Sequence, residues 1–356
     1  MLPRFHWIVI GLCFRTQKRL APFRRRDGSF LLKDEPTSIN DMKLVDKKPD
    51  PARITVVIAV HNRLAYTQRC IHALKSGVRN ISFSFVVIDD GSNDGTADWL
   101  ASQSEMQTIK GDGNLWFGGA TALGFQHILN YHTRSSHVLI LNNDTFIRPG
   151  AVDSMLAATK GDDCTVVAAA YWTEDRREAN SAGFRWKRWQ GLRDVSSIGE
   201  WVRENRVSSG LYLPVDGVAT TLVLIPMPLL QKTKLPDPQQ HPHNRYDAVL
   251  SARMRKAGAR LLCSTELLAD HRYGPDDQRP TVRKMKLGRF LNESFSDRRS
   301  VWHLAGGCAV MWEVAPNPIQ ASWAVLLRIA HFLRQLAWVT LNSIRVQSVR
   351  TEAAKI

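Results

Sequence analysis

Short apolar runs alternate with segments of helical periodicity along the first two thirds of the chain. The run Ile54–Val60 is rich in β-branched residues, which is typical of a strand buried on both faces of a parallel sheet. Leu64–Ser76 predicts a helix with Gly77 as its C-cap. The same patterns predict strands at Phe83–Ile88, Val138–Leu141, Val218–Ile225 and Leu261–Ser264, and helices at Gly118–Tyr131 and Ala248–Ala257.

Turn-forming residues mark the junctions between these elements. Asp89–Thr96 reads D-D-G-S-N-D-G-T and predicts a turn that opens a helix, with Thr96 as its N-cap. Residues 171–215 combine charges and glycines with tryptophans that we expect to pack rather than to bind sugar: Trp172, Trp186, Trp189 and Trp201. The alternation of strands and helices predicts an α/β fold on a mostly parallel sheet with right-handed crossovers.

Composition divides the chain into a basic extension (residues 1–52), an α/β domain (53–275) and a basic helical tail (276–356). No run of about 18 uncharged apolar residues occurs, so we expect no membrane-spanning helix. The apolar stretch Phe5–Phe14 is short and is expected at most at a surface. Five cysteines without a C-x-x-C pair fit a reducing compartment and argue against a zinc finger.

The tail predicts a basic amphipathic helix, because no Asp or Glu occurs between Ile319 and Arg350. With Trp323 and Trp338, such a helix fits binding at a membrane interface; the alternative is packing on the α/β domain or in a dimer. At about 100° per residue, one face is apolar and the other polar. The apolar face contains Val325, Ile329, Phe332, Leu333, Leu336 and Val339, and the polar face Arg328, His331, Gln335, Asn342 and Arg345.

The net charge of +15 and the estimated pI of 9.9 favour anionic partners, which include phosphorylated substrates, anionic lipid surfaces and nucleic acid. No nucleic-acid-binding motif accompanies the charge, so nucleic acid is not an expected partner.

Polar clusters follow three of the predicted strands. They are His61-Asn62-Arg63, Asp89-Asp90-Gly91-Ser92 and Asn142-Asn143-Asp144, and the glycine-rich segment Gly113–Gly119 precedes a helix between the second and third. The carboxyl ends of parallel strands meet at one edge of a sheet, where open α/β sheets bind ligands. Carboxylates, backbone amides and a helix N-terminus at that edge suit a nucleotide with its diphosphate and a divalent cation.

Four motifs in this order resemble family 2 glycosyltransferases of the GT-A fold, in the bacterial rhamnosyltransferase-like branch that works on cell-surface polysaccharides: V-V-I-A-V-H-N-R, V-V-I-D-D-G-S-N-D-G-T, G-D-G-N-L-W-F-G-G-A and L-I-L-N-N-D-T-F-I-R-P-G. The resemblance implies inverting transfer of a sugar from a nucleotide-diphosphate donor, such as dTDP-rhamnose or a UDP-sugar, to a glycan or lipid-linked acceptor. It also implies Mg²⁺ or Mn²⁺ as cofactor, and a cytoplasmic location that includes the cytoplasmic face of the inner membrane.

The resemblance implies roles for the matching residues. Asp90 hydrogen-bonds the nucleotide base, and Asp144 is the metal-binding carboxylate of an Asp-rich triplet that reads Asn-Asn-Asp here. His271 is a second metal ligand or a contact of the diphosphate, and Asp247 is the base that takes the proton of the acceptor hydroxyl. The remaining donor-binding positions are His61, Asn62, Arg63, Asp89, Gly91, Ser92, Asn114, Trp116, Gly118 and Asn143.

Other interpretations stay open at the level of sequence. A nucleotidyltransferase shares the sheet and the metal chemistry, and a non-catalytic nucleotide-sugar- or carbohydrate-binding relative fits the reduced Asp-rich triplet. Asp247 also suits the N-terminus of a helix, His271 the end of a strand, and Trp116 either a stacking position or the core.

Overall fold

The structure is a computed structural model that describes residues 50–78, 81–173, 179–194, 212–243, 245–272, 282 and 285–353. Its strands are β1 (Asp50–Val60), β2 (Ser82–Asp89), β3 (Met106–Lys110), β4 (Ser135–Leu141), β5 (Thr145–Ile147), β6 (Thr165–Thr173), β7 (Ala179–Ser181), β8 (Phe184–Lys187), β9 (Gly191–Asp194), β10 (Tyr212–Pro214), β11 (Leu222–Pro226) and β12 (Arg260–His271). Its helices are α2 (Leu64–Ser76), α3 (Thr96–Ala101), α4 (Trp116–Tyr131), α5 (Ala151–Thr159), α7 (Met227–Lys232), α8 (Tyr246–Lys256), α9 (Leu287–Phe295), α10 (Leu304–Val314) and α11 (Pro318–Ala353).

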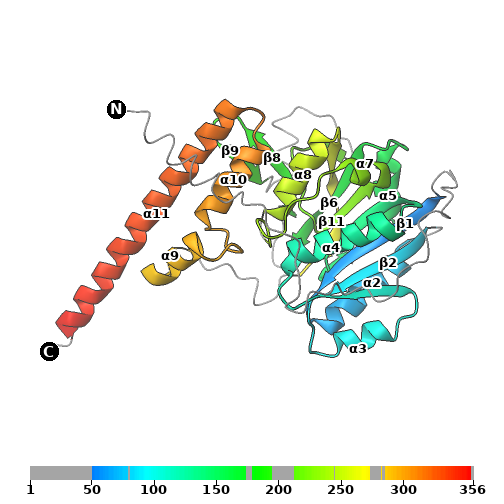
Figure 1. Ribbon diagram of the computed structural model, residues 1–356, viewed down its shortest axis with the longest axis horizontal. Helices are drawn as coiled ribbons and strands as arrows, with labels where there is room; N and C mark the ends of the chain where they lie inside the picture. The colour runs from blue at the N-terminus through cyan, green and yellow to red at the C-terminus, as the bar shows by residue number, and fades with distance from the viewer. Residues whose placement is uncertain are drawn as a thin grey trace, which may run out of the picture. The chain divides into compact units, whose positions relative to one another are not determined.

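One large sheet organises the fold, in the order β10-β12-β6-β11-β4-β1-β2-β3, with β5 beside β12 and β7 beside β6. Figure 1 labels β6, β11, β1 and β2 of this sheet. The ladders β1–β2, β1–β4, β2–β3 and β6–β12 are parallel, whereas β11 runs antiparallel to both β4 and β6. The predicted α/β fold with a mostly parallel sheet is confirmed.

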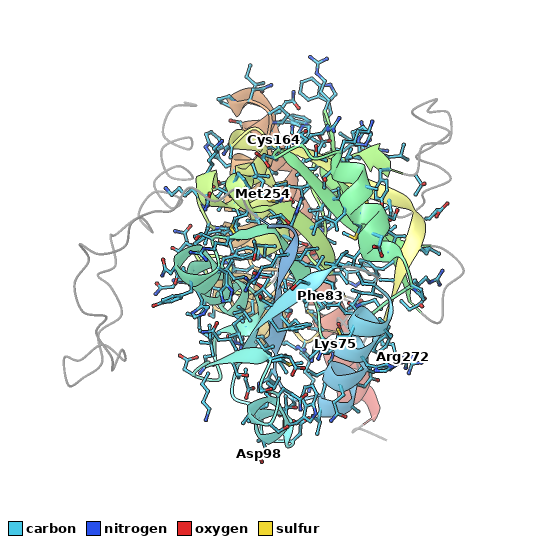
Figure 2. All side chains as sticks on the ribbon, turned by 90° about the vertical axis from the view of Figure 1, so that its right-hand side faces the viewer. Lys75, Phe83, Asp98, Cys164, Met254 and Arg272 are labelled. Carbon is cyan, nitrogen blue, oxygen red and sulfur yellow. The ribbon has the colours of Figure 1, made fainter. Side chains whose placement is uncertain are left out.

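Helices cover both faces of the sheet because the buried strands are apolar on both sides. Val57 of β1 faces a core that contains α4, α7 and α8, whereas its neighbour Ile58 faces a core with α2, α3 and α5. Side chains fill both faces in Figure 2, where Met254 belongs to the first core and Phe83 packs against the second. This three-layer arrangement holds the ends of the central strands at fixed positions.

Several predicted boundaries needed correction. The N-cap of α3 is Gly95 rather than Thr96, because the carboxylate of Asp94 accepts the Thr96 amide and hydroxyl at 3.1 and 2.5 Å. Strand β3 was not predicted, and β12 continues to His271, well beyond the predicted Leu261–Ser264. Helix α2 and its C-cap Gly77 are as predicted, although Gly77 is right-handed at φ −86°.

The helical tail is present and packs on the rest of the described chain through α10. Val310 and Val314 of α10 bury their side chains against Val249 and Ala252 of α8. On α11, Phe332, Leu336 and Val339 of the predicted apolar face pack with Phe290 of α9. Phe332, Leu336 and Val339 are therefore internal, whereas Leu333, predicted on the same face, is 56% exposed.

Pro318–Ile344 of α11 is the single stretch in the described residues that is long and apolar enough to cross a membrane, judged by length and composition. The sequence expectation missed it because Arg328 and Arg334 interrupt the apolar run. The four described cysteines, Cys70, Cys164, Cys263 and Cys308, are free. The expectations for residues 1–49 and for Trp201 concern residues outside the described ones, and the three-part division of the chain stays a prediction.

Candidate functional site

The ends of β1 and β2 are joined by hydrogen bonds between their predicted donor-binding residues. The Nδ1 atom of His61 lies 2.6 Å from the carbonyl oxygen of Asp90, and the amide of Asn62 donates to Ser92 Oγ at 2.7 Å. The amide of Ser92 donates to the carboxylate of Asp89 at 3.0 Å. Asn62 and Arg63 adopt positive φ angles of 57° and 64°, which turn the chain sharply from β1 into α2.

Asp90 anchors the glycine-rich segment before α4. Its carboxylate is buried and accepts three backbone amides, from Gly113 at 2.9 Å, Leu115 at 3.2 Å and Trp116 at 2.9 Å. A carboxylate that accepts several amides fixes the loop that donates them. The sequence analysis assigned Asp90 to the nucleotide base and did not predict that Asp90 also holds this loop, because the three hydrogen bonds depend on the backbone conformation of the loop.

The loop before α8 lies against the N-terminus of α4. The amide of Gly118 donates to the carbonyl of Pro242 at 2.8 Å, and Gly118 leaves no room for a side chain. The imidazole of His241 is buried; burial, followed by the charges of Arg253 and Arg245, lowers its pKa to about 4, so it is neutral at pH 7. Close packing at Gly118 therefore sets the position of the loop that leads to Asp247.

Replacement of Gly118 by alanine should destabilise the protein by about 1–3 kcal/mol. A Cβ atom at this position would lie 2.2 Å from the carbonyl oxygen of His241 and 2.9 Å from that of Pro242, both of them backbone atoms. Urea unfolding measures the change. Gly288→Ala on α9 is the matched control, because a Cβ there meets nothing within 4 Å. Equal stability of the two variants would contradict the close packing at Gly118.

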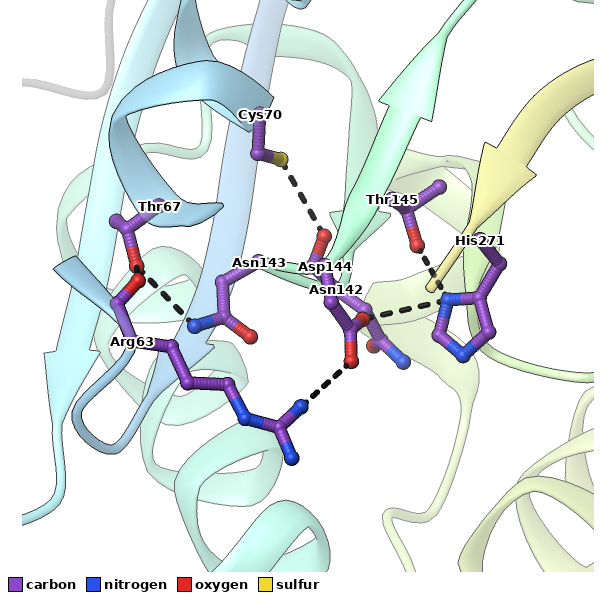
Figure 3. A network of polar contacts seen from close by, with 8 residues as sticks. All are labelled: Arg63, Thr67, Cys70, Asn142, Asn143, Asp144, Thr145 and His271. Atoms are coloured by element: carbon purple, nitrogen blue, oxygen red, sulfur yellow. Dashed lines mark hydrogen bonds and ion pairs between the residues drawn. The ribbon is translucent and has the colours of Figure 1, made fainter. Parts of the chain in front are cut away.

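Asp144 lies at the centre of a second polar cluster, shown in Figure 3. Its buried carboxylate pairs with Arg63 Nη1 at 3.0 Å through Oδ2, and Oδ1 lies 3.3 Å from His271 Nδ1. Thr145 Oγ1 also lies 3.0 Å from that nitrogen. Asn143, next to Asp144 in the chain, donates through Nδ2 to Thr67 Oγ1 at 3.1 Å.

Strand pairing explains how His271 reaches Asp144 from a distant part of the sequence. The short strand β5 runs antiparallel to the end of β12, and the register sets His271 opposite Thr145. The amide of Arg272 donates to the carbonyl of Asp144 at 3.0 Å and continues this pairing. Beside the cluster, burial, followed by the charge of Asp144, raises the pKa of the Cys70 thiol, which donates to the carbonyl of Asn142 at 3.3 Å.

The donor set at Asp144 fits a divalent cation that takes its other ligands from a substrate. No cluster of three or more His, Cys, Asp or Glu side chains suited to a metal occurs in the described residues. Asp144 and His271 offer one carboxylate and one imidazole, which suit Mn²⁺ and leave most of the coordination shell to phosphate oxygens and water. Arg63 adds a fixed positive charge on the same carboxylate.

Trp116 occupies an exposed position between two other side chains. The residue is 39% exposed, with the guanidinium of Arg299 4.5 Å from the ring centroid and the ring of His243 5.8 Å away. Trp116 is therefore not part of the core. Sequence reasoning missed Arg299 because it lies about 180 residues further along the chain, in the tail.

Asp247 lies in the first turn of α8 and is half-buried. The N-cap of this helix is Arg245, with a positive φ of 76°, so the N-cap alternative for Asp247 is wrong. Its Oδ1 atom accepts the Ala248 amide at 2.8 Å. Arg245 donates to the carbonyls of Ser300 and His303, which fastens the start of α8 to the tail.

Among the remaining predicted positions, Gly91 and Asn114 are exposed at the same edge of the sheet. Gly91 has φ +76°, and a Cβ there would lie 3.0 Å from Gly113 Cα. The Asn114 amide donates to Asp112 at 2.8 Å. The predicted site residues thus form two groups. The first contains His61, Asp90 and Trp116 and extends to the Gly118–Pro242 contact, and the second contains Arg63, Asp144 and His271.

Residues 55–199 match the family model described as glycosyl transferase family 2. Among solved structures, the chain is similar to a crystal structure of GalNAc-T7 with UDP, GalNAc and Mn²⁺, at a TM-score of 0.52 and 13% sequence identity. The match covers 82% of this chain and 57% of that chain, so the present chain spans little more than half of the neighbour's length. No curated protein matches the sequence.

The two comparisons agree with the observed sheet and with the motifs that surround its edge. They do not identify the bacterial rhamnosyltransferase branch, which stays a prediction. Because the sequence identity is only 13%, the solved structure supports the fold alone. The family match applies to residues 55–199. Residues 55–199 therefore resemble glycosyl transferase family 2, and the chain has the GT-A fold.

Proposed function

We propose that the protein is an inverting glycosyltransferase that moves a sugar from a nucleotide-diphosphate donor to an acceptor hydroxyl. One observation carries the proposal: Asp144, Arg63 and His271 converge at the edge of the sheet where β1 and β4 end. A carboxylate, a guanidinium and an imidazole together suit a diphosphate and its cation.

The donor would bind with its diphosphate near Arg63 and its base near the ends of β1 and β2. Asp144 and His271 would hold Mg²⁺ or Mn²⁺, which supplies positive charge for the leaving diphosphate. Arg63 adds a second positive charge that needs no metal. A carboxylate such as that of Asp90 accepts the ring N–H that uracil and thymine share, so both UDP-sugars and dTDP-sugars suit this site.

Asp247 would act as the general base of the reaction. In an inverting transfer the acceptor oxygen attacks the anomeric carbon from the side opposite the diphosphate, and its proton passes to a carboxylate oxygen. The Gly118–Pro242 contact fixes the loop before Asp247 relative to the donor-binding edge of the sheet. The acceptor would be a hydroxyl of a glycan or of a lipid-linked sugar, as in cell-surface polysaccharide synthesis.

Thermal unfolding in the presence of nucleoside diphosphates and nucleotide-sugars, with and without Mn²⁺, tests this proposal. A ligand at about 100 times its Kd should add roughly 2.7 kcal/mol of apparent stability. We expect one nucleotide class to stabilise the protein in a Mn²⁺-dependent manner. Asp144→Ala should abolish the Mn²⁺ dependence, and Asp163→Ala, which removes an exposed carboxylate elsewhere, should preserve it.

Product analysis separates the remaining alternatives. A nucleotidyltransferase would consume a nucleoside triphosphate and release diphosphate, whereas the proposed enzyme releases a nucleoside diphosphate from a nucleotide-sugar. Stabilisation by a donor without turnover would favour the non-catalytic relative. Absence of any stabilisation by the nucleotides, in folded protein, would refute the proposed donor site.

A further inference from the structure

Exposed large apolar side chains concentrate on the C-terminal helix. Among the exposed large hydrophobic residues of the described chain, most lie on α11: Ile319, Trp323, Leu326, Leu333, Trp338, Leu341 and Ile344. Their exposed fractions range from 42% at Trp323 to 75% at Ile319. Soluble monomers seldom expose a contiguous apolar surface of this kind without a partner for it.

Apart from Trp338, these exposed residues form a stripe on the side of α11 opposite the residues that pack against α9. At about 100° per residue, eight positions fall within roughly 40° of one line along the helix. They are Ile319, Trp323, Leu326, Ala330, Leu333, Ala337, Leu341 and Ile344, and we call this set the outer stripe. The outer stripe is about 37 Å long and contains no polar residue.

The opposite side of α11 is already occupied. Val339 is buried and Phe332 stacks on Phe290 of α9 at 5.7 Å, while the guanidinium of Arg328 donates to the carbonyl of Val301 at 2.7 Å. A helix that crossed a bilayer would need lipid on all sides and would lose these contacts. The geometry therefore favours a helix that lies along a surface with only the outer stripe inserted.

The charges beside the outer stripe are positive. Arg334 is exposed on its flank, and Trp323 meets the β8–β9 turn, where its ring lies 6.1 Å from that of Trp189. That turn also carries the exposed residues Lys187 and Arg188. No Asp or Glu occurs between Ile319 and Arg350, so two copies of α11 paired along this stripe would bring like charges together without acidic partners.

We propose that the outer stripe of α11 binds the surface of a bilayer that contains anionic phospholipid. The apolar stripe inserts at the boundary between headgroups and acyl chains, and the flanking cations contact the phosphates. Tryptophan at both the stripe and the neighbouring turn suits that boundary, where indole rings are enriched, and the Trp323 N–H donates to the Trp189 carbonyl at 3.1 Å. This inference rests on α11 and its neighbours, and does not depend on the reaction at the sheet edge.

Vesicle co-flotation of the full chain tests the proposal. We expect binding to phosphatidylcholine vesicles that contain phosphatidylglycerol, little binding to phosphatidylcholine alone, and release at high salt. The double substitution Leu326→Glu/Leu333→Glu should weaken binding more than about tenfold, and Arg334→Gln about fivefold. Tyr131→Glu is the matched control, since Tyr131 is 67% exposed on α4, away from the stripe, and should bind as the wild type does.

Other results would overturn the proposal. Unchanged binding of the double variant would show that the outer stripe does not contact the membrane. Equal binding to neutral and anionic vesicles would show that the flanking positive charges do not contribute to binding. Binding that resists high salt would indicate a spanning helix. A dimer in sedimentation analysis that the double substitution dissociates would assign the stripe to a second copy of the chain. Circular dichroism and thermal unfolding verify that each variant is folded.

Discussion

The substitution Asp247→Asn should lower kcat by about 100- to 10,000-fold and leave donor binding unchanged. Asparagine retains an oxygen that can accept the Ala248 amide at 2.8 Å, so the first turn of α8 keeps its hydrogen bond. The amide cannot take a proton from the acceptor hydroxyl at neutral pH. Turnover with the donor found in the nucleotide panel measures kcat, and thermal unfolding with the same donor measures binding.

Asp237→Asn is the matched control for this experiment. Asp237 is an exposed carboxylate ahead of the same loop, and it accepts the Gln239 amide and the Gln240 side chain of its own turn. Its replacement should leave kcat within about twofold. If Asp247→Asn kept its turnover, Asp247 would be a structural residue of α8, and the base would have to be sought elsewhere. A fall in stability together with an unaltered kcat would lead to the same conclusion.

The sequence predicts the strands β1, β2 and β4 and their polar ends, because both depend on local pattern, but it does not predict β3 or β6. Buried parallel strands such as β1 are continuous apolar runs, and their ends are marked by an abrupt change to polar residues at His61 and Asn142. Adjacent parallel strands place these ends side by side at one edge of the sheet, independently of the structure elsewhere in the chain. The His61–Asp90 contact at 2.6 Å is therefore accessible to reasoning from sequence.

Contacts that depend on distant pairing are not accessible in the same way. The position of His271 beside Asp144 requires β12 to extend far beyond its apolar start and to pair antiparallel with the three-residue strand β5. A strand of three residues is too short to show the alternation of apolar and polar residues that would predict it. The family resemblance suggested His271, whereas hydropathy alone would have ended β12 near Ser264. The Arg63–Asp144 ion pair likewise depends on the positive φ angles after β1.

Helix α11 shows a different limit of sequence reasoning. Its predicted apolar face exists, but Phe332 and Val339 on that face are used for packing against α9. Arg328, which was assigned to the polar face, donates to a backbone carbonyl of the tail. The outer stripe combines large apolar residues with alanines, so a single hydrophobic direction does not describe this helix. Only the packing shows which of two apolar faces remains exposed.

The substitution Asp90→Ala should lower the free energy of unfolding by about 2–4 kcal/mol. It removes the acceptor of three amides, from Gly113, Leu115 and Trp116, that a buried carboxylate now holds at 2.9–3.2 Å. Asp90→Asn should lower the free energy of unfolding by about half as much. One side-chain oxygen remains as an acceptor, whereas the new NH₂ group is a donor that faces the Trp116 N–H. Urea unfolding measures both changes, with Asp163→Ala, which removes an exposed carboxylate, as the matched control.

The outcome decides between two uses of Asp90. Two of its hydrogen bonds share Oδ1, and Oδ2 accepts one, so the carboxylate can still accept an N–H from a bound base without releasing the loop. A loss of stability in both variants, together with weaker nucleotide binding, would mean that Asp90 serves the loop and the base at once. Weaker nucleotide binding at wild-type stability would mean that the loop holds its conformation without the carboxylate. In that case Gly118 and its contact with Pro242 would be the main restraint on the start of α4.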